Sequence, residues 1–235
     1  MFLALILAAL LPFELYAQRH PQIENLPKFD RRVYHFGFIL GVNQMNFAVK
    51  PVSDLHQFDS LIGITTKPDF GFDIGIVSSL RIADHFNIRF IPTLSFGDRS
   101  LEYSVKLKDS IVTTQVKRVE STFMEFPLML KYKSRRLTNF QVYVVGGAKY
   151  VIDMASQADK KNKNLNEAPV KLRKSDYLGE IGTGCDFYLT YFKFGIELKM
   201  SYGLRDLLKR EDSIYTNSVK RLNSKIFQLS FTFEG

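Results

Sequence analysis

Strict alternation of apolar and polar residues over Tyr191–Gly203 is the clearest pattern in the sequence. In the stretch YFKFGIELKMSYG every second residue is apolar from Phe192 to Tyr202, and lysine, glycine, glutamate and serine stand between them. A period of two residues is typical of a β-strand with one apolar and one polar face. The period alone does not say which of the two faces looks into the protein.

The same period recurs along the rest of the chain and predicts eight strands. The 21 phenylalanines and 11 tyrosines, spread over the sequence, favour the same interpretation because aromatic residues are enriched in strands. The predicted strands are Tyr34–Phe47, Phe70–Arg81, Phe86–Phe96, Ser121–Tyr132, Asn139–Asp153, Asp176–Tyr188, Tyr191–Gly203 and Ser224–Glu234.

The connections between the predicted strands alternate strictly between short and long. Short ones lie at Ala83–His85, at Lys133–Thr138 and around Thr190, and the others are each about twenty residues long. This alternation is typical of an outer-membrane β-barrel with short periplasmic turns and long extracellular loops. The predicted long loops are Ala48–Asp69, Gly97–Glu120, Met154–Ser175 and Leu204–Asn223.

Strand length indicates which face is outside. The predicted strands are about twice as long as the five or six residues usual in soluble proteins, and about ten tilted residues cross a bilayer. We therefore expect an all-β, eight-stranded antiparallel transmembrane barrel whose apolar row faces lipid. The alternative is a soluble barrel, such as a lipocalin, with its apolar row inside.

The polar row of the strands mixes acids and bases in nearly equal numbers with many glycines. The interior of an eight-stranded barrel is just filled by side chains, so we expect a filled polar lumen. An isolated buried ion costs several kcal/mol, which predicts that these charges are paired. The expected lumen charge network is Asp73, Arg89, Glu125, Lys131, Lys149, Glu180, Lys193, Glu197 and Lys199, and Asp153 and Asp186 lie in the same row.

The N-terminus divides the chain into three predicted parts. Residues 1–17 resemble a secretory signal peptide cut after Ala17, and their apolar run is too short for a membrane-spanning helix. Residues 18–33 are a polar lead-in that we expect to be mobile in the periplasm. Residues 34–235 form the predicted barrel, which places the protein in the outer membrane. The single cysteine, Cys185, is expected to pack on an apolar face.

The net charge of +8 and the pI of about 9.4 raise the question of an acidic partner. No nucleic-acid-binding motif accompanies the charge, so nucleic acid is not an expected partner. The loop Met154–Ser175 is rich in lysine. Its Lys160, Lys161 and Lys163 are candidate contacts to lipopolysaccharide or to a protein partner, and ordinary solubility explains them equally well.

The sequence carries no pattern for a catalytic or cofactor site. It has no phosphate-binding loop, no metal-ligand spacing and no nucleophile elbow, and we expect neither a cofactor nor an enzymatic activity. One enzymatic alternative stays open, because some eight-stranded outer-membrane barrels modify lipid A with a His and a Ser at the outer rim. The loop residues that such a site could use are His56, Ser60, Ser110 and Ser213.

The segment ESTFMEFPLMLKYKSRRLTNFQVYVVGGAKYVIDMAS resembles the PorT family of Bacteroidetes outer-membrane barrels. The likeness rests on the strand with Glu125-Phe126-Pro127-Leu128, the short basic turn and Gly146-Gly147. It implies a non-catalytic role in the type IX secretion system, which exports proteins with C-terminal signal domains. The implied partners are other secretion components, outer-membrane lipid and lipopolysaccharide. A lipid A-modifying barrel and a generic adhesin-like barrel are the alternatives.

Overall fold

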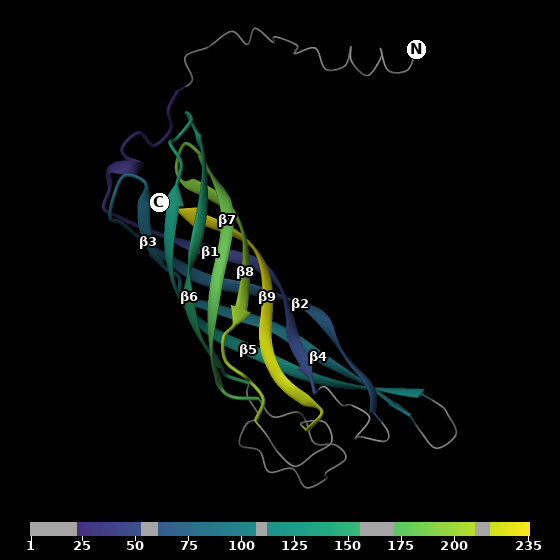
Figure 1. The fold of residues 1–235 in the computed structure, drawn as a ribbon. Coiled ribbons are helices and arrows are strands. Elements are labelled where there is room, and N and C mark those ends of the chain that lie inside the picture. Colours follow the sequence, from purple (N-terminus) through teal and green to yellow (C-terminus); the bar gives the residue numbers. More distant parts are fainter. Residues whose placement is uncertain (1–22, 53–60, 107–111, 156–171, 210–216) are drawn as a thin grey trace, which may run out of the picture.

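The computed structural model describes residues 23–52, 61–106, 112–155, 172–209 and 217–235, which form one closed antiparallel sheet (Figure 1). No helix among these residues is long and apolar enough to cross a membrane. A 3₁₀ turn, η1 (Phe29–Arg31), precedes the sheet. The strands are β1 (Tyr34–Pro51), β2 (Leu61–Arg81), β3 (Phe86–Phe90), β4 (Thr93–Lys106), β5 (Val112–Lys133), β6 (Phe140–Asp153), β7 (Ser175–Tyr188), β8 (Lys193–Gly203) and β9 (Val219–Glu234).

Pairing between the first and last strands closes the sheet into a barrel. Each strand pairs antiparallel with its neighbours in the wall, and β1 pairs with β2 and also with β9, the latter from Gly37↔Glu234 to Pro51↔Val219. Closure satisfies the backbone groups of every strand inside the wall, which is required where the wall meets lipid.

The strands β3 and β4 occupy one position in the wall, so the prediction of eight strands is confirmed. Both pair with β2 and with β5, and they keep one register against β5. Pro92 interrupts the ladder between them because proline has no N–H. Pro127 on β5 lies opposite Ile91 and has no N–H to donate to the Ile91 carbonyl. The Thr93 hydroxyl donates to that carbonyl instead, at 2.8 Å.

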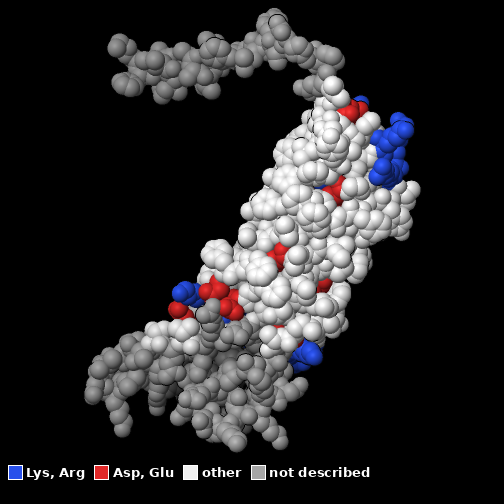
Figure 2. Space-filling view, turned by 180° about the vertical axis from the view of Figure 1, so that it is seen from behind, with Lys and Arg blue, Asp and Glu red and all other residues white. Residues whose placement is uncertain are grey.

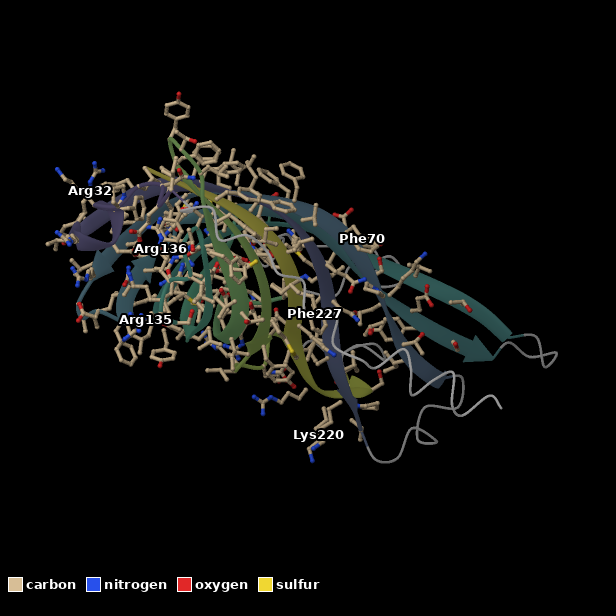
Figure 3. The ribbon with its side chains drawn as sticks, turned by 90° about the horizontal axis from the view of Figure 1, so that it is seen from above. Arg32, Phe70, Arg135, Arg136, Lys220 and Phe227 are labelled. Atoms are coloured by element: carbon tan, nitrogen blue, oxygen red, sulfur yellow. The ribbon has the colours of Figure 1, made fainter. Side chains whose placement is uncertain are left out.

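The predicted loop Met154–Ser175 lies between β6 and β7 as expected, but the other three predicted extracellular loops are too long. β2 begins at Leu61, and β4 and β5 stay paired from Asp98↔Glu120 to Lys106↔Val112, through the predicted loop Gly97–Glu120. In Figures 1 and 3 these strands continue from the wall and run beyond the rest of the barrel. The physical reason is that the outer face of this extension meets water, so its apolar residues point inward. Leu101 and Tyr103 are buried and alternate with Glu102 and Ser104, in the opposite phase to the wall strands.

The outer face of the wall is an apolar band. The side chains of Ile76, Ile181 and Leu198 are 63%, 69% and 57% exposed, and Phe38 and Phe233 stack on the outside with ring centroids 4.7 Å apart. Lysine and arginine gather near the two ends of the surface drawn in Figure 2, and its middle is largely uncharged. Because a soluble barrel would bury this row, the apolar row is the lipid face, as predicted.

The two ends of the wall make the orientation testable with single cysteines. With Cys185→Ser as background, we expect Lys67→Cys on the extracellular sheet to react with an impermeant thiol reagent on intact cells. We expect Arg135→Cys, in the β5–β6 turn, to react only after the outer membrane is opened; both side chains are exposed. Labelling of position 135 but not 67 in intact cells would reverse the orientation.

Candidate functional site

The centre of the lumen is built around a buried arginine. Arg89, on β3, reaches across the barrel so that its Nη1 lies 2.6 Å from Glu197 Oε2 on β8 and its Nη2 lies 3.6 Å from Glu234 Oε1 on β9. All three side chains are 1% exposed. Every second residue of a barrel strand points into the lumen, and these three residues all occupy such inward positions on their strands.

A second part of the network surrounds Lys149 on β6. Its Nζ lies 2.8 Å from Glu125 Oε2 and 3.0 Å from Glu180 Oε2, on the two neighbouring strands. Lys199 Nζ lies 3.5 Å from Glu180 Oε1 and 3.3 Å from Glu197 Oε1. Lys199 therefore connects the Lys149 group to the Arg89 group.

A third part lies toward the periplasmic end. Asp186 Oδ2 is 2.7 Å from Lys131 Nζ and 3.6 Å from Lys193 Nζ. Lys193 Nζ is in turn 2.8 Å from Glu234 Oε2. The three parts form one continuous set of ion pairs. Lys199 connects the first part to the second, and Glu234, which contacts both Arg89 and Lys193, connects the first part to the third.

Sequence reasoning placed Asp186 in the polar row but left it out of the expected network, and it missed Glu234. A usable signal existed for Glu234, since it follows the outward Phe233 and is therefore in phase with the inward row. Both carboxylates are 1% exposed, and each contacts two cations.

Asp73 lies in the lumen but departs from the expectation that every enclosed charge is ion-paired. Its carboxylate accepts hydrogen bonds from Asn43 Nδ2 at 2.6 Å, from Gln228 Nε2 at 2.7 Å and from the Ser95 hydroxyl. No described cation lies within ion-pair distance of it. Neutral donors can stabilise a buried carboxylate when they satisfy its lone pairs.

The extracellular end of the lumen is apolar, in contrast to the expected polar filling. The connections before β7 and after β8 fold over the barrel mouth: the backbones of Leu172 and Leu208 form a bridge, and Leu207 N donates to the Leu222 carbonyl at 2.8 Å. The buried residues of this extracellular plug are Phe47, Leu101, Tyr103, Leu172, Leu207, Leu208, Val219 and Leu222.

Arg99 separates the extracellular plug from the charged layers below it. Its guanidinium carbon lies 4.5 Å from the Phe47 ring centroid and 4.7 Å from that of Phe123, and its Nη2 donates to the Ser121 hydroxyl at 2.9 Å. A planar cation between two aromatic rings is desolvated at low cost because the rings attract its charge.

The described part of the N-terminal lead-in closes the periplasmic end, so the prediction that the lead-in is mobile is wrong for residues 23–33. Phe29 is 4% exposed and stacks on His35 with centroids 4.1 Å apart. The Asp30 carboxylate accepts hydrogen bonds from Lys133 Nζ at 2.9 Å and from the Tyr188 hydroxyl at 3.0 Å. We call residues 23–33 the periplasmic plug.

The environment of Asp30 makes the periplasmic plug sensitive to acid. Burial acts to raise the pKa of this carboxyl, but the hydrogen bonds and charge of Lys133, with Tyr188, hold the pKa below its ordinary value. The contact is therefore fully formed above about pH 4, the usual pKa of aspartate, and is lost as the pH falls through the lower folded value.

The remaining candidates from the sequence are loop residues and the single cysteine. Lys160, Lys161, Lys163, His56, Ser60, Ser110 and Ser213 lie outside the described residues. Among the described residues no group of histidine, cysteine, aspartate and glutamate could hold a metal ion. Cys185 is half-buried on the lipid face. Most of the charged side chains in the described interior are thus ion-paired between the two plugs.

Comparison with known proteins identifies the family of the chain. A family model described as outer membrane protein beta-barrel domain matches residues 16–209. The chain belongs to this family. Membership agrees with the apolar outer band and establishes an outer-membrane location. No curated protein matches the sequence significantly.

Several solved outer-membrane proteins match the chain at low similarity. OprG from Pseudomonas aeruginosa is 12% identical over 86% of this chain and 94% of its own, with a TM-score of 0.43. Neisserial surface protein A is 12% identical over 84% and 96%, with a TM-score of 0.39. The N-terminal barrel domain of Pseudomonas aeruginosa OprF is 13% identical over 84% and 97%, with a TM-score of 0.33.

Removing Glu197 tests the ion network of this family member. Glu197→Ala removes the nearer carboxylate of both Arg89 and Lys199, which keep only Glu234 at 3.6 Å and Glu180 at 3.5 Å, and we expect it to lower the free energy of unfolding by about 3–5 kcal/mol. Glu197→Gln keeps an acceptor for Arg89 and should cost less. Urea unfolding in lipid vesicles measures both, with Glu102→Ala on the extracellular sheet as the control. Equal stability of Glu197→Ala and Glu102→Ala would show that the network contributes nothing.

Removing the Asp30 charge tests the periplasmic plug. Loss of a charge-assisted hydrogen bond costs about 1.5–3 kcal/mol, so Asp30→Asn should speed tryptic cleavage after Arg31 and Arg32 by roughly tenfold or more. The matched control is Asp84→Asn, since the Asp84 side chain is 82% exposed beside Arg81. Cleavage of Asp30→Asn and Asp84→Asn at the same rate would contradict a docked plug.

Proposed function

We propose that this protein is a non-catalytic outer-membrane component of the type IX secretion system, needed for the export of proteins with C-terminal signal domains. The carrying observation is the filled lumen, in which Arg89, Glu197 and Glu234 meet across the barrel. A lumen filled in this way leaves no open path, so the barrel suits a rigid structural role in the membrane better than the role of an export channel. The link to type IX secretion itself rests on the resemblance of the segment around Pro127 and Gly146-Gly147 to the PorT family.

The residues that carry this resemblance have architectural roles in the barrel. Pro127 lies opposite Ile91, at the interruption between β3 and β4. A Cβ on Gly147 would lie 2.1 Å from the Leu128 carbonyl oxygen, so β5 and β6 approach too closely for a side chain. The motif thus describes how this wall is built, and it provides no catalytic group to carry over from the family.

The mechanism that we favour is scaffolding. A barrel with a fixed interior holds its lipid-facing wall in a constant shape, which suits contact with a larger translocon component. The loop lysines Lys160, Lys161 and Lys163 are candidates for that contact or for contact with lipopolysaccharide. A structural role needs no movement through the lumen and no cofactor.

Deletion of the gene tests this proposal. We expect cargo with C-terminal signal domains to disappear from the cell surface and to accumulate in the periplasm. The lipid A mass spectrum should stay unchanged, because the proposed role is not enzymatic. Cell fractionation and immunoblotting of one cargo protein measure the effect. Normal surface display in the deletion strain would reject a role in this secretion system.

Complementation separates scaffolding from rim catalysis. A copy with His56→Ala, Ser60→Ala, Ser110→Ala and Ser213→Ala should restore export as well as the natural protein does, since scaffolding uses no nucleophile. An altered lipid A in the deletion strain, uncorrected by the substituted copy, would favour the lipid A-modifying alternative over the role proposed here.

A further inference from the structure

One side of the extracellular rim carries cations from four neighbouring strands without exposed acids among the described residues. Arg173 and Lys174 precede β7, Arg205 follows β8, Arg221 and Lys225 lie on β9, and Lys50 lies near the end of β1. Lys225 is half-buried and the others are exposed. We call these residues the basic rim.

The acids of this region are turned away from the basic rim. Asp153 and Asp176 are each 4% exposed and point into the barrel. Asp206 Oδ1 accepts hydrogen bonds from the backbone N–H groups of Leu208 at 3.3 Å and Leu222 at 3.0 Å, so it serves the extracellular plug. Asp153 lies 3.7 Å from the buried Arg99, so its charge serves the lumen and not the rim.

Lys50 and Arg221 face each other directly. They are register partners in the β1–β9 pair, and both side chains are exposed. Arg221 Nη2 donates to the Leu204 carbonyl at 2.7 Å, and no described carboxylate pairs with either cation. Like charges directly opposite on a sheet are destabilising, and an anion between them would relieve that repulsion.

An apolar groove of about 630 Å³ lies on the outer wall immediately below the basic rim. Its walls include Val42, Ile181, Leu198, Phe227 and Leu229, which all face lipid. Lys225 Nζ is 5.2 Å from the centroid of the Phe227 ring, so the rim and the groove are adjacent. Figure 3 shows Phe227 on β9, with Lys220 beyond it toward the extracellular end.

The opposite side of the extracellular end has a different charge pattern. The outward row of β4 includes Asp98 and Glu102, and Lys67 lies beside them on β2. The face drawn in Figure 2 accordingly carries acidic and basic side chains together near its extracellular end. The concentration of positive charge over an apolar groove is thus a local feature of the β7–β9 and β1 side.

We propose that the basic rim and the groove bind a phosphorylated glycolipid of the outer leaflet, the lipid A part of lipopolysaccharide. A cluster of lysine and arginine at a membrane surface selects anionic lipid headgroups, and arginine suits phosphate through paired N–H donors. The cations contact the phosphates, and the groove takes an acyl chain. An acidic protein would match the rim but would leave the apolar groove below it unused.

Binding of purified lipid A to the full-length mature protein in detergent micelles tests this inference. The test variant is Lys50→Gln, Arg221→Gln, Lys225→Gln. Each cation near an anionic lipid surface contributes about fivefold in affinity, so we expect a loss on the order of 100-fold. The control is Arg31→Gln, Arg32→Gln, Arg135→Gln, which removes as many exposed cations at the periplasmic end and should bind like the natural protein. A heat-modifiable gel shift verifies that both fold.

Two further lipids, tested in the same assay, distinguish lipid A from other sources of phosphate. Lipid A with its phosphates removed should bind as weakly as the test variant binds the intact lipid. Phosphatidylglycerol, with one phosphate, should bind less tightly than lipid A. Unchanged lipid A affinity of the test variant, or equal affinity for lipid A with and without phosphates, would overturn the inference. If the test variant bound lipid A normally but no longer bound an acidic protein, the inference would also be overturned. The basic rim would then be a protein-docking surface.

Discussion

Burial of many charges inside a closed ring of strands is the constraint on which the structure depends. Arg89 and Glu197 are withdrawn from water at the middle of a barrel whose outer face is apolar. Each such ion is stable only with its partners in place, since a stranded buried charge costs several kcal/mol. The β8–β9 register places Glu234 opposite Lys193, and the closure of β9 onto β1 brings the same carboxylate within reach of Arg89 on β3, so closure of the wall and pairing of the lumen depend on each other.

The two ends of the lumen exclude water from the buried charges with different side chains. At the periplasmic end, Phe29 covers the charged layer and Asp30 joins it through Lys133. At the extracellular end, Leu207 and Leu222 belong to an apolar plug that excludes water from Arg99 and the layers beneath. The described barrel is therefore solid along its axis, and its surfaces are what it offers to lipid and to partners.

Much of this could be predicted from the sequence, because lipid imposes one polarity on the outside of every wall strand. Alternation predicted the strands and placed Glu125, Lys149 and Glu197 inside. It did not predict the extracellular extension of β2, β4 and β5, where the outer face meets water and apolar residues such as Leu101 and Tyr103 point inward instead. It also missed the burial of Phe29, because that burial depends on contacts with Tyr188, which is distant in the sequence.

Conductance across a planar bilayer tests the central claim, that this family member is a solid barrel and not a channel. Purified protein inserted at neutral pH should give no steady conductance, because the ion network and both plugs fill the lumen. Insertion is verified by proteolysis from one side of the bilayer. Stable, porin-like conductance steps from inserted natural protein would contradict the account, since they require a continuous aqueous path past Arg89.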